Sequence, residues 1–150
     1  MISIQSLGYC IIKTLLIISI IILSVSPSQS NNFFLESVTQ LKWENRIILV
    51  RPKNNLKDVL LDFKIAKSKI LDRHINWFVF FEDKIYTNYK GDIAENFNKN
   101  MVRKYFSVAS LSMVLIGKDG TVKQEAKDFN LNAFFELIDS MPMRKIEMEN

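Results

Sequence analysis

Three runs of consecutive apolar residues constrain the fold of this 150-residue chain more than any other feature. They occupy residues 47–50, 77–81 and 111–116, and only Ser112 interrupts the last one. Strand side chains alternate between the two faces of a sheet, so an unbroken apolar run predicts a strand that is covered on both faces. The length fits one ordinary domain, in which helices would supply that cover.

Amphipathic segments separate the three runs. After Pro52, Asn55 followed by Asp58 predicts a helix start, and apolar residues then recur at three- and four-residue steps as far as Ile70. The length of this segment suits a parallel crossover between the first two strands. A second helix is predicted to begin at Asp92, with Glu95 at the capping-box position.

The remaining segments complete the predicted order. Residues 33–44 carry a weak helical pattern, and residues 117–120 form a turn sequence that predicts a hairpin. A last helix, capped by Asp128 or Asn130, is predicted to stop at Pro142. The order β-α-β-α-β-β-α is that of thioredoxin-like proteins. We therefore predict an α/β fold with a mixed four-stranded sheet and helices on both faces.

The first thirty residues differ from the rest of the chain. An apolar run of twelve residues follows Lys13, and small residues at Ser28 and Ser30 precede Asn31, which is a signal-peptide profile. Twelve residues are too short to span a bilayer. We expect cleavage between Ser30 and Asn31, export to the periplasm or the exterior, and a single domain over residues 31–150. An uncleaved membrane anchor is the alternative.

Removal of the leader would change the chemistry that is available. Cys10 is the only cysteine and precedes the apolar run, so residues 31–150 can form no disulfide, thiolate nucleophile or cysteine-ligated metal site. Lys13 is the only charged residue of the leader, so residues 31–150 carry a formal charge of +3. So small a charge predicts no nucleic-acid partner. The aromatic residues at 77–81 are expected to pack in the core, and Lys64, Lys67 and Lys69 to form a solvated face.

Three segments resemble the DUF4174 family: residues 41–50, residues 115–120 with Lys123, and residues 138–144 with Glu147 and Met148. The resemblance runs from about Leu41 to Met148. The positions that carry it outside the apolar runs are Arg46, Lys118, Asp119, Gly120, Lys123, Asp139, Met141, Pro142, Met143 and Arg144. It implies a thioredoxin-like, often exported domain without a settled activity, related to a domain of extracellular sushi-repeat and coiled-coil-containing matrix proteins.

Thioredoxin-like enzymes place redox cysteines after the first strand, at the start of the next helix. Here residues 51–55 contain no sulfur, and residues 108–110, before the third strand, contain no proline. Thiol oxidoreductase and peroxidase activities are therefore not expected, and the sequence favours a binding or structural module over an enzyme.

Ligands of α/β sheets bind where parallel strands end. This rule selects a candidate binding surface made of Arg51, Lys53, Asn54, Asn55, Glu82 and Asp83, with Lys84 beside them. The surface would receive an envelope or extracellular protein, a glycan or a small anion. In the alternative interpretation, Asn55 only caps the helix and the cations are solvated.

Two further features suggest other chemistry less strongly. His74 is the only histidine, and it could join Glu82 and Asp83 in a metal or general-base site only if the fold brings them together. Met141, Met143 and Met148 form a thioether group of the kind that copper(I) prefers. These methionines more simply fill space near the core. An enzyme or copper carrier of undefined class remains the alternative function, and no cofactor is predicted.

Overall fold

A computed structural model describes residues 33–149. The predicted leader, including Cys10 and the cleavage position, lies outside the described residues. The elements in chain order are η1 (Val38–Leu41), β1 (Arg46–Val50), α2 (Leu56–Ile65), α3 (Lys67–Asp72), β2 (Ile75–Phe81), β3 (Lys84–Thr87), α4 (Phe97–Tyr105), β4 (Met113–Ile116), β5 (Val122–Ala126), α5 (Leu131–Ser140) and α6 (Pro142–Glu149). In this part of the chain, no helix is both long and apolar enough to span a bilayer.

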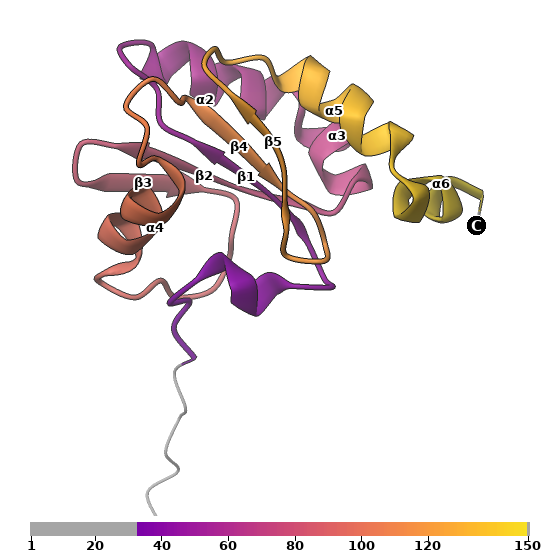
Figure 1. Cartoon of the computed structure of the whole chain (residues 1–150), viewed down its shortest axis with the longest axis horizontal. Helices are drawn as coiled ribbons and strands as arrows, with labels where there is room; N and C mark the ends of the chain where they lie inside the picture. The colour runs from indigo at the N-terminus through magenta and orange to yellow at the C-terminus, as the bar shows by residue number, and fades with distance from the viewer. Residues whose placement is uncertain (1–32, 150) are drawn as a thin grey trace, which may run out of the picture. The chain divides into compact units, whose positions relative to one another are not determined.

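One mixed five-stranded sheet organises residues 33–149, in the order β3-β2-β1-β4-β5 (Figure 1). β1 and β2 are parallel, with Ile48 opposite Trp77, and β4 runs antiparallel to β1, with Leu115 opposite Ile48. β4 and β5 form an antiparallel hairpin. The predicted α/β class, the parallel crossover and the hairpin are confirmed.

The prediction of a four-stranded sheet was wrong, because β3 adds an edge strand antiparallel to β2. A two-residue turn at Glu82 and Asp83 joins these strands without a glycine, and Glu82 has a φ of 52°. The side chain of Asn88 prolongs the pairing: its Oδ1 accepts from Trp77 N at 2.8 Å and its Nδ2 donates to Ile75 O at 2.9 Å.

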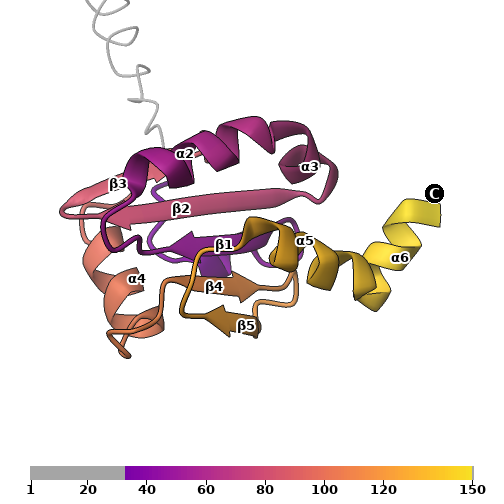
Figure 2. The same ribbon diagram turned by 90° about the horizontal axis from the view of Figure 1, so that it is seen from above.

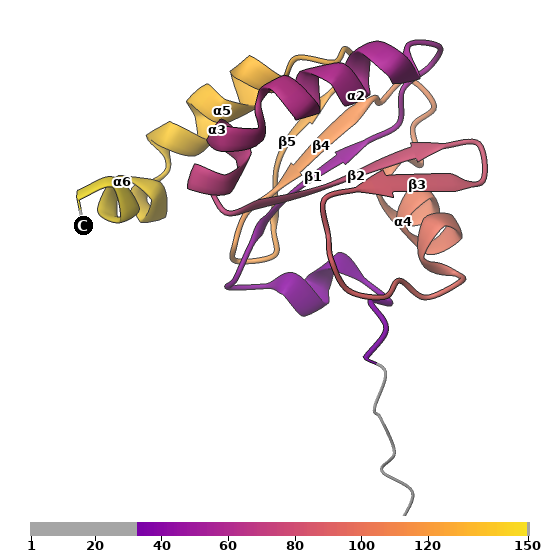
Figure 3. The same ribbon diagram turned by 180° about the vertical axis from the view of Figure 1, so that it is seen from behind.

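The sheet separates two apolar cores, as the unbroken apolar runs predict. Ile47 and Leu49 of β1 face η1 and α4, whereas Ile48 and Val50 face α2, α3 and α5. Figure 3 shows α2, α3 and α5 over this second face of the sheet. All five residues of β1 are buried. Burial of every side chain therefore fixes β1 as the centre of the fold.

Three helix predictions need correction. The first helix is broken at Ala66 into α2 and α3, and the Asn55 side chain makes no capping hydrogen bond. The second begins at Phe97 instead of Asp92. Backbone pairing prevents the earlier start, because Leu35 N donates to Asp92 O at 2.8 Å and Ala94 N donates to Leu35 O at 3.1 Å.

The helix that starts near Asn130 ends at Ser140, before Pro142 as predicted, but a further helix that was not predicted follows it. Proline suits the first position of a helix, where its missing N–H is not needed, and Pro142 accordingly begins α6. The predicted cap of the preceding helix α5 is confirmed at Asn130, whose side chain accepts from Ala133 N. The segment predicted as a weak helix contains only the short 3-10 helix η1. α6 continues beyond α5, away from the strands (Figure 2).

Candidate functional site

A hollow lies where β1 and β2 end, and we call it the strand-end groove. It encloses about 670 Å³. Its lining residues are Arg51, Phe80, Glu82, Asp83, Glu95, Asn96, Asn98, Lys99, Val102 and Arg103. Arg51, Glu82 and Asp83 directly follow the parallel strands and were predicted to meet there, Phe80 of β2 was not predicted, and α4 with its leading turn contributes the rest.

The strand-end groove is lined by positively and negatively charged side chains that do not pair with one another. Within residues 33–149, the side chains of Arg51, Glu82, Asp83, Glu95 and Lys99 make no ion pair and no hydrogen bond. Charged groups in this condition are available to a molecule that enters the groove, and they orient it by charge complementarity.

The other predicted surface residues lie apart from the strand-end groove. Lys53 lines a separate hollow of about 300 Å³, which shares Arg51 with the groove. Asn54 and Asn55 line neither hollow. Sequence reasoning also missed Lys99 and Arg103, whose i,i+4 spacing on α4 places them on one helix face.

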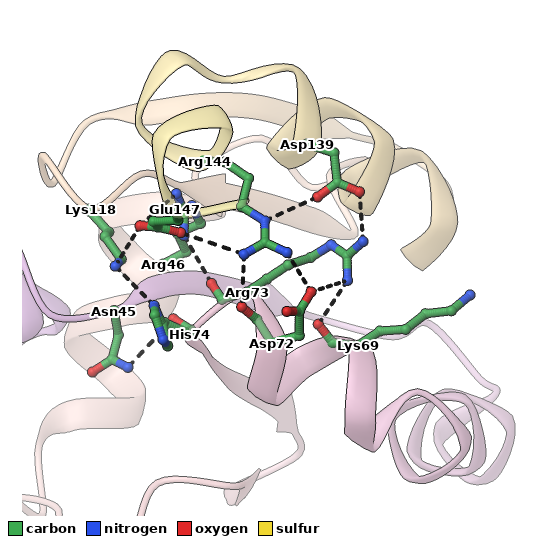
Figure 4. Close-up of polar contacts among 10 residues, drawn as sticks. All are labelled: Asn45, Arg46, Lys69, Asp72, Arg73, His74, Lys118, Asp139, Arg144 and Glu147. Atoms are coloured by element: carbon green, nitrogen blue, oxygen red, sulfur yellow. Dashed lines mark hydrogen bonds and ion pairs between the residues drawn. The ribbon is translucent and has the colours of Figure 1, made fainter. Parts of the chain in front are cut away.

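A second group of charged residues lies at the opposite end of β1, and we call it the charged cluster (Figure 4). Its members come from β1, α3 and its C-cap, the β4–β5 turn, α5 and α6. They are Arg46, Asp72, Arg73, Lys118, Asp139, Arg144 and Glu147.

Arg46 is the most buried member of the charged cluster, with 1% of its surface exposed. Its guanidinium donates two parallel hydrogen bonds to Glu147, from Nη1 to Oε2 at 2.9 Å and from Nη2 to Oε1 at 3.3 Å. Nη1 also donates to Arg73 O at 3.0 Å. This bidentate geometry compensates the buried charge and attaches α6 to the start of β1.

Arg144 extends the charged cluster from α6 to α3. Its Nη1 donates to Asp72 O at 2.9 Å, its Nη2 pairs with the Asp72 carboxylate, and its Nε donates to Asp139 Oδ1 at 3.4 Å. Asp139 also accepts from Arg73 Nη2 at 2.6 Å. Arginines and carboxylates therefore alternate across the junction between α3, α5 and α6.

The electrostatics of the charged cluster lower the pKa of two carboxyl groups. Burial by itself raises the pKa of Glu147, but hydrogen bonds and charges from Arg46 and Lys118 outweigh burial and lower the pKa to about 2. Burial opposes the change at Asp139 as well, and Arg73 and Arg144 together hold its pKa below the usual range. Both carboxylates are thus charged at neutral pH.

His74 belongs to the charged cluster's edge and not to a metal site with Glu82 and Asp83. Lys118 Nζ lies 2.8 Å from Glu147 Oε1 and 3.1 Å from His74 Nδ1. Because an ammonium group can only donate, His74 Nδ1 accepts this bond. The whole of β2 separates His74 from Glu82, roughly 20 Å. Among the described residues, no three His, Cys, Asp or Glu side chains are grouped to hold a metal ion.

Met141 and Met143 share a hollow of about 230 Å³ with cationic residues. Arg46, Lys118 and Lys123 line it together with the two methionines. Asp119 also lines the hollow, and each of these cations is paired with a carboxylate, Arg46 and Lys118 with Glu147 and Lys123 with Asp119. Met141 packs against the second core, and Met148 is exposed on α6. Core filling therefore accounts for Met141 alone, because Met143 is 42% exposed and Met148 is 52% exposed.

The β4–β5 turn carries the other motif residues. Asp119 accepts from Lys123 Nζ at 2.7 Å and from Thr121 N at 3.1 Å, and the bond from Lys123 is the main cause of a lowered Asp119 pKa. Gly120 has a φ of 76°, which favours glycine. These contacts fix the shape of the turn that holds Lys118 over Glu147.

Comparison with known proteins adds a family and no chemistry. No curated protein and no solved structure matches the chain. The family model described as "Domain of unknown function (DUF4174)" matches residues 37–147, which include every member of the charged cluster and of the strand-end groove. The chain therefore belongs to the DUF4174 family.

Proposed function

We propose that this protein is an exported, thioredoxin-like binding module that uses no thiol chemistry. The arrangement of four of its strands supports the thioredoxin-like assignment: β1 and β2 are parallel, β4 is antiparallel to β1, and β5 completes a hairpin. Helices cover both faces of this sheet. The signal-peptide profile of residues 1–30 supports export.

The position of redox cysteines in thioredoxin-like enzymes corresponds here to residues 51–55. This segment contains Arg51 and Lys53 but no sulfur atom, and Cys10 lies in the predicted leader. A thiolate is the nucleophile of disulfide exchange, so the exchange reaction has no nucleophile in this domain. The proposal therefore excludes disulfide reductase activity.

The strand-end groove is the single observation that carries the binding function. Three cations, Arg51, Lys99 and Arg103, and three carboxylates, Glu82, Asp83 and Glu95, line one hollow together with the apolar side chains of Phe80 and Val102. A simple anion would meet three carboxylates there. A polypeptide segment with charges of both signs matches the groove better, so the proposed partner is an envelope or extracellular protein.

Glu82 gives the groove a second functional feature. Its φ of 52° lies in the left-handed region, which costs a non-glycine residue about 1 kcal/mol. Strained residues of this kind are concentrated at functional sites. Glu82 lines the groove at a turn position where glycine would be less strained.

Photo-cross-linking in the native host tests the proposal. A photoreactive residue at position 99 is expected to give a discrete protein adduct, whereas the same residue at position 57, on α2 outside the groove, is expected to give none. Charge reversal by Arg51→Glu with Arg103→Glu, two cations of the groove, should remove the adduct. An adduct that survives the reversal contradicts the site, and reductase activity of the purified protein contradicts the absence of thiol chemistry.

A further inference from the structure

A different hollow lies on the opposite face of the sheet, between α2 with α3 and the β2–β3 edge, and we call it the lysine-rimmed groove. It encloses about 410 Å³, within the usual range of small-molecule sites. Phe63, Trp77 and Leu71 give it an apolar lining, together with two further aliphatic residues of α2 and α3. The strand-end groove shares no residue with it.

Aromatic packing forms the rigid floor of the lysine-rimmed groove. The rings of Phe63 and Trp77 stack with centroids 4.4 Å apart and planes inclined by 12°. Trp77 is only half-buried, and Leu71 is 63% exposed. Apolar surface of this kind gains free energy when a hydrocarbon or aromatic group covers it.

The charges around this floor are all positive. Lys64, Lys67 and Lys90 line the groove, and no acidic side chain does. Within residues 33–149, these lysines make no ion pair. Three cations around one apolar hollow repel each other, and an anion placed among them relieves that repulsion.

From this geometry we propose that the lysine-rimmed groove binds a small amphiphilic anion, a carboxylate with an alkyl or aryl body. The body covers Trp77 and Leu71, with the buried ring of Phe63 supporting Trp77 from beneath, and the carboxylate lies among the lysines at the rim. Lysine side chains suit this role because their hydrocarbon stems extend the apolar wall while the ammonium groups stay in water. Lys64 and Lys67, which the sequence analysis places on a solvated face, thus contact a ligand in this proposal.

Trp77 supplies a direct measurement. The chain has two tryptophans, and Trp43→Phe leaves Trp77 as the only one. Titration of this variant with monomeric decanoate is expected to change Trp77 emission saturably at one equivalent. Uncharged 1-decanol should bind about tenfold more weakly, because it lacks the charge that the lysines attract.

Matched variants separate the lysines from the general charge of the protein. Lys64→Gln with Lys67→Gln is expected to weaken decanoate binding about tenfold and to leave 1-decanol binding unchanged. Lys57→Gln with Lys127→Gln removes the same charge from outside the groove and should leave both affinities unchanged. Circular dichroism verifies that each variant is folded.

Three results would overturn the assignment: no saturable emission change, equal affinities for decanoate and 1-decanol, or equal losses in the two double variants. A chain that binds anionic phospholipid vesicles but not decanoate would also overturn it, because the surface would then recognise a membrane and not a small ligand. These readouts do not involve the strand-end groove, so failure here leaves the proposed protein partner unaffected.

Discussion

Two arginines mark the ends of the same central strand and have opposite environments. Arg46 begins β1 with 1% of its surface exposed and donates to Glu147 and to Arg73 O. Arg51 follows the end of β1, is exposed, and makes no side-chain hydrogen bond or ion pair within the described residues. Only the four strand residues 47–50 thus separate a hydrogen-bonded cation from an unpaired one.

Under the proposed function, the same residue type serves stability at one end of β1 and binding at the other. A buried guanidinium destabilises the fold strongly when its partner is removed, because the remaining charge has no water to replace the lost bonds. An exposed guanidinium is already hydrated and contributes little to stability. The charged cluster holds α6 in place, and the available charges of the strand-end groove are the reason for proposing it as the recognition site.

The largest expected effect separates these two arginines with the same substitution. Arg46→Met should lower the free energy of unfolding by roughly 3 kcal/mol, because Glu147 and Arg73 O lose their buried donor. Arg51→Met should change it by less than about 0.5 kcal/mol. Urea unfolding followed by tryptophan fluorescence measures both. Equal losses of unfolding free energy in the two variants would show that Arg46 and Arg51 contribute equally to stability.

Glu147 makes the same contrast visible as a dependence on pH. Its pKa of about 2 in the fold lies below the value near 4.5 of a free glutamate, so its contribution is present above pH 4.5 and is lost as pH falls toward 2. Glu147→Gln should remove roughly 2 kcal/mol at pH 7 and much less at pH 2.

The matched control for this pH experiment is Glu82→Gln in the strand-end groove, whose side chain has no cationic partner within residues 33–149. It should leave the pH profile of unfolding close to that of the parent protein. If Glu147→Gln lowers the free energy of unfolding by the same amount at pH 7 and pH 2, the ion pair with Arg46 does not determine how the stability depends on acid.

The contacts at the two ends of β1 also differ in how well they can be predicted from the sequence. Arg51, Glu82 and Asp83 were predicted to meet because parallel strands end at one edge of a sheet. The pairing of Arg46 with Glu147 spans 101 positions, and that of Arg144 with Asp72 spans 72. A buried arginine before an apolar strand indicates that some carboxylate is needed, but spacing does not select which one.

The fold shows the same limit. The three central strands were predictable because burial on both faces leaves an unbroken apolar run. β3 was missed because it lies at the edge, where alternation is weak, and because its turn uses Glu82 where a glycine would have signalled a hairpin. The start of α4 was missed because Leu35, distant in sequence, pairs with the backbone around Ile93.

Glu82 offers a substitution with an expected gain. Glu82→Gly relieves the strain of the positive φ but adds freedom to the unfolded chain, so the net stabilisation should be about 0.5 kcal/mol. The same change should reduce the adduct at position 99, since it removes one carboxylate from the groove. If Glu82→Gly stabilises the protein but leaves the adduct unchanged, Glu82 acts only in the turn. If the variant is less stable than the parent protein, the positive φ of Glu82 does not strain the fold.

The smallest expected effect lies within the DUF4174 resemblance itself. Lys123 and Asp119 form an ion pair at 2.7 Å, but both side chains are 33% exposed. Lys123→Gln should therefore destabilise the protein by no more than about 0.5 kcal/mol, in contrast to the loss at Arg46, and 0.5 M NaCl should abolish the difference. If Lys123→Gln instead lowers the free energy of unfolding nearly as much as Arg46→Met, the ion pair of Asp119 must be needed to position Lys118 against Glu147. The β4–β5 turn would then have to be counted as part of the charged cluster.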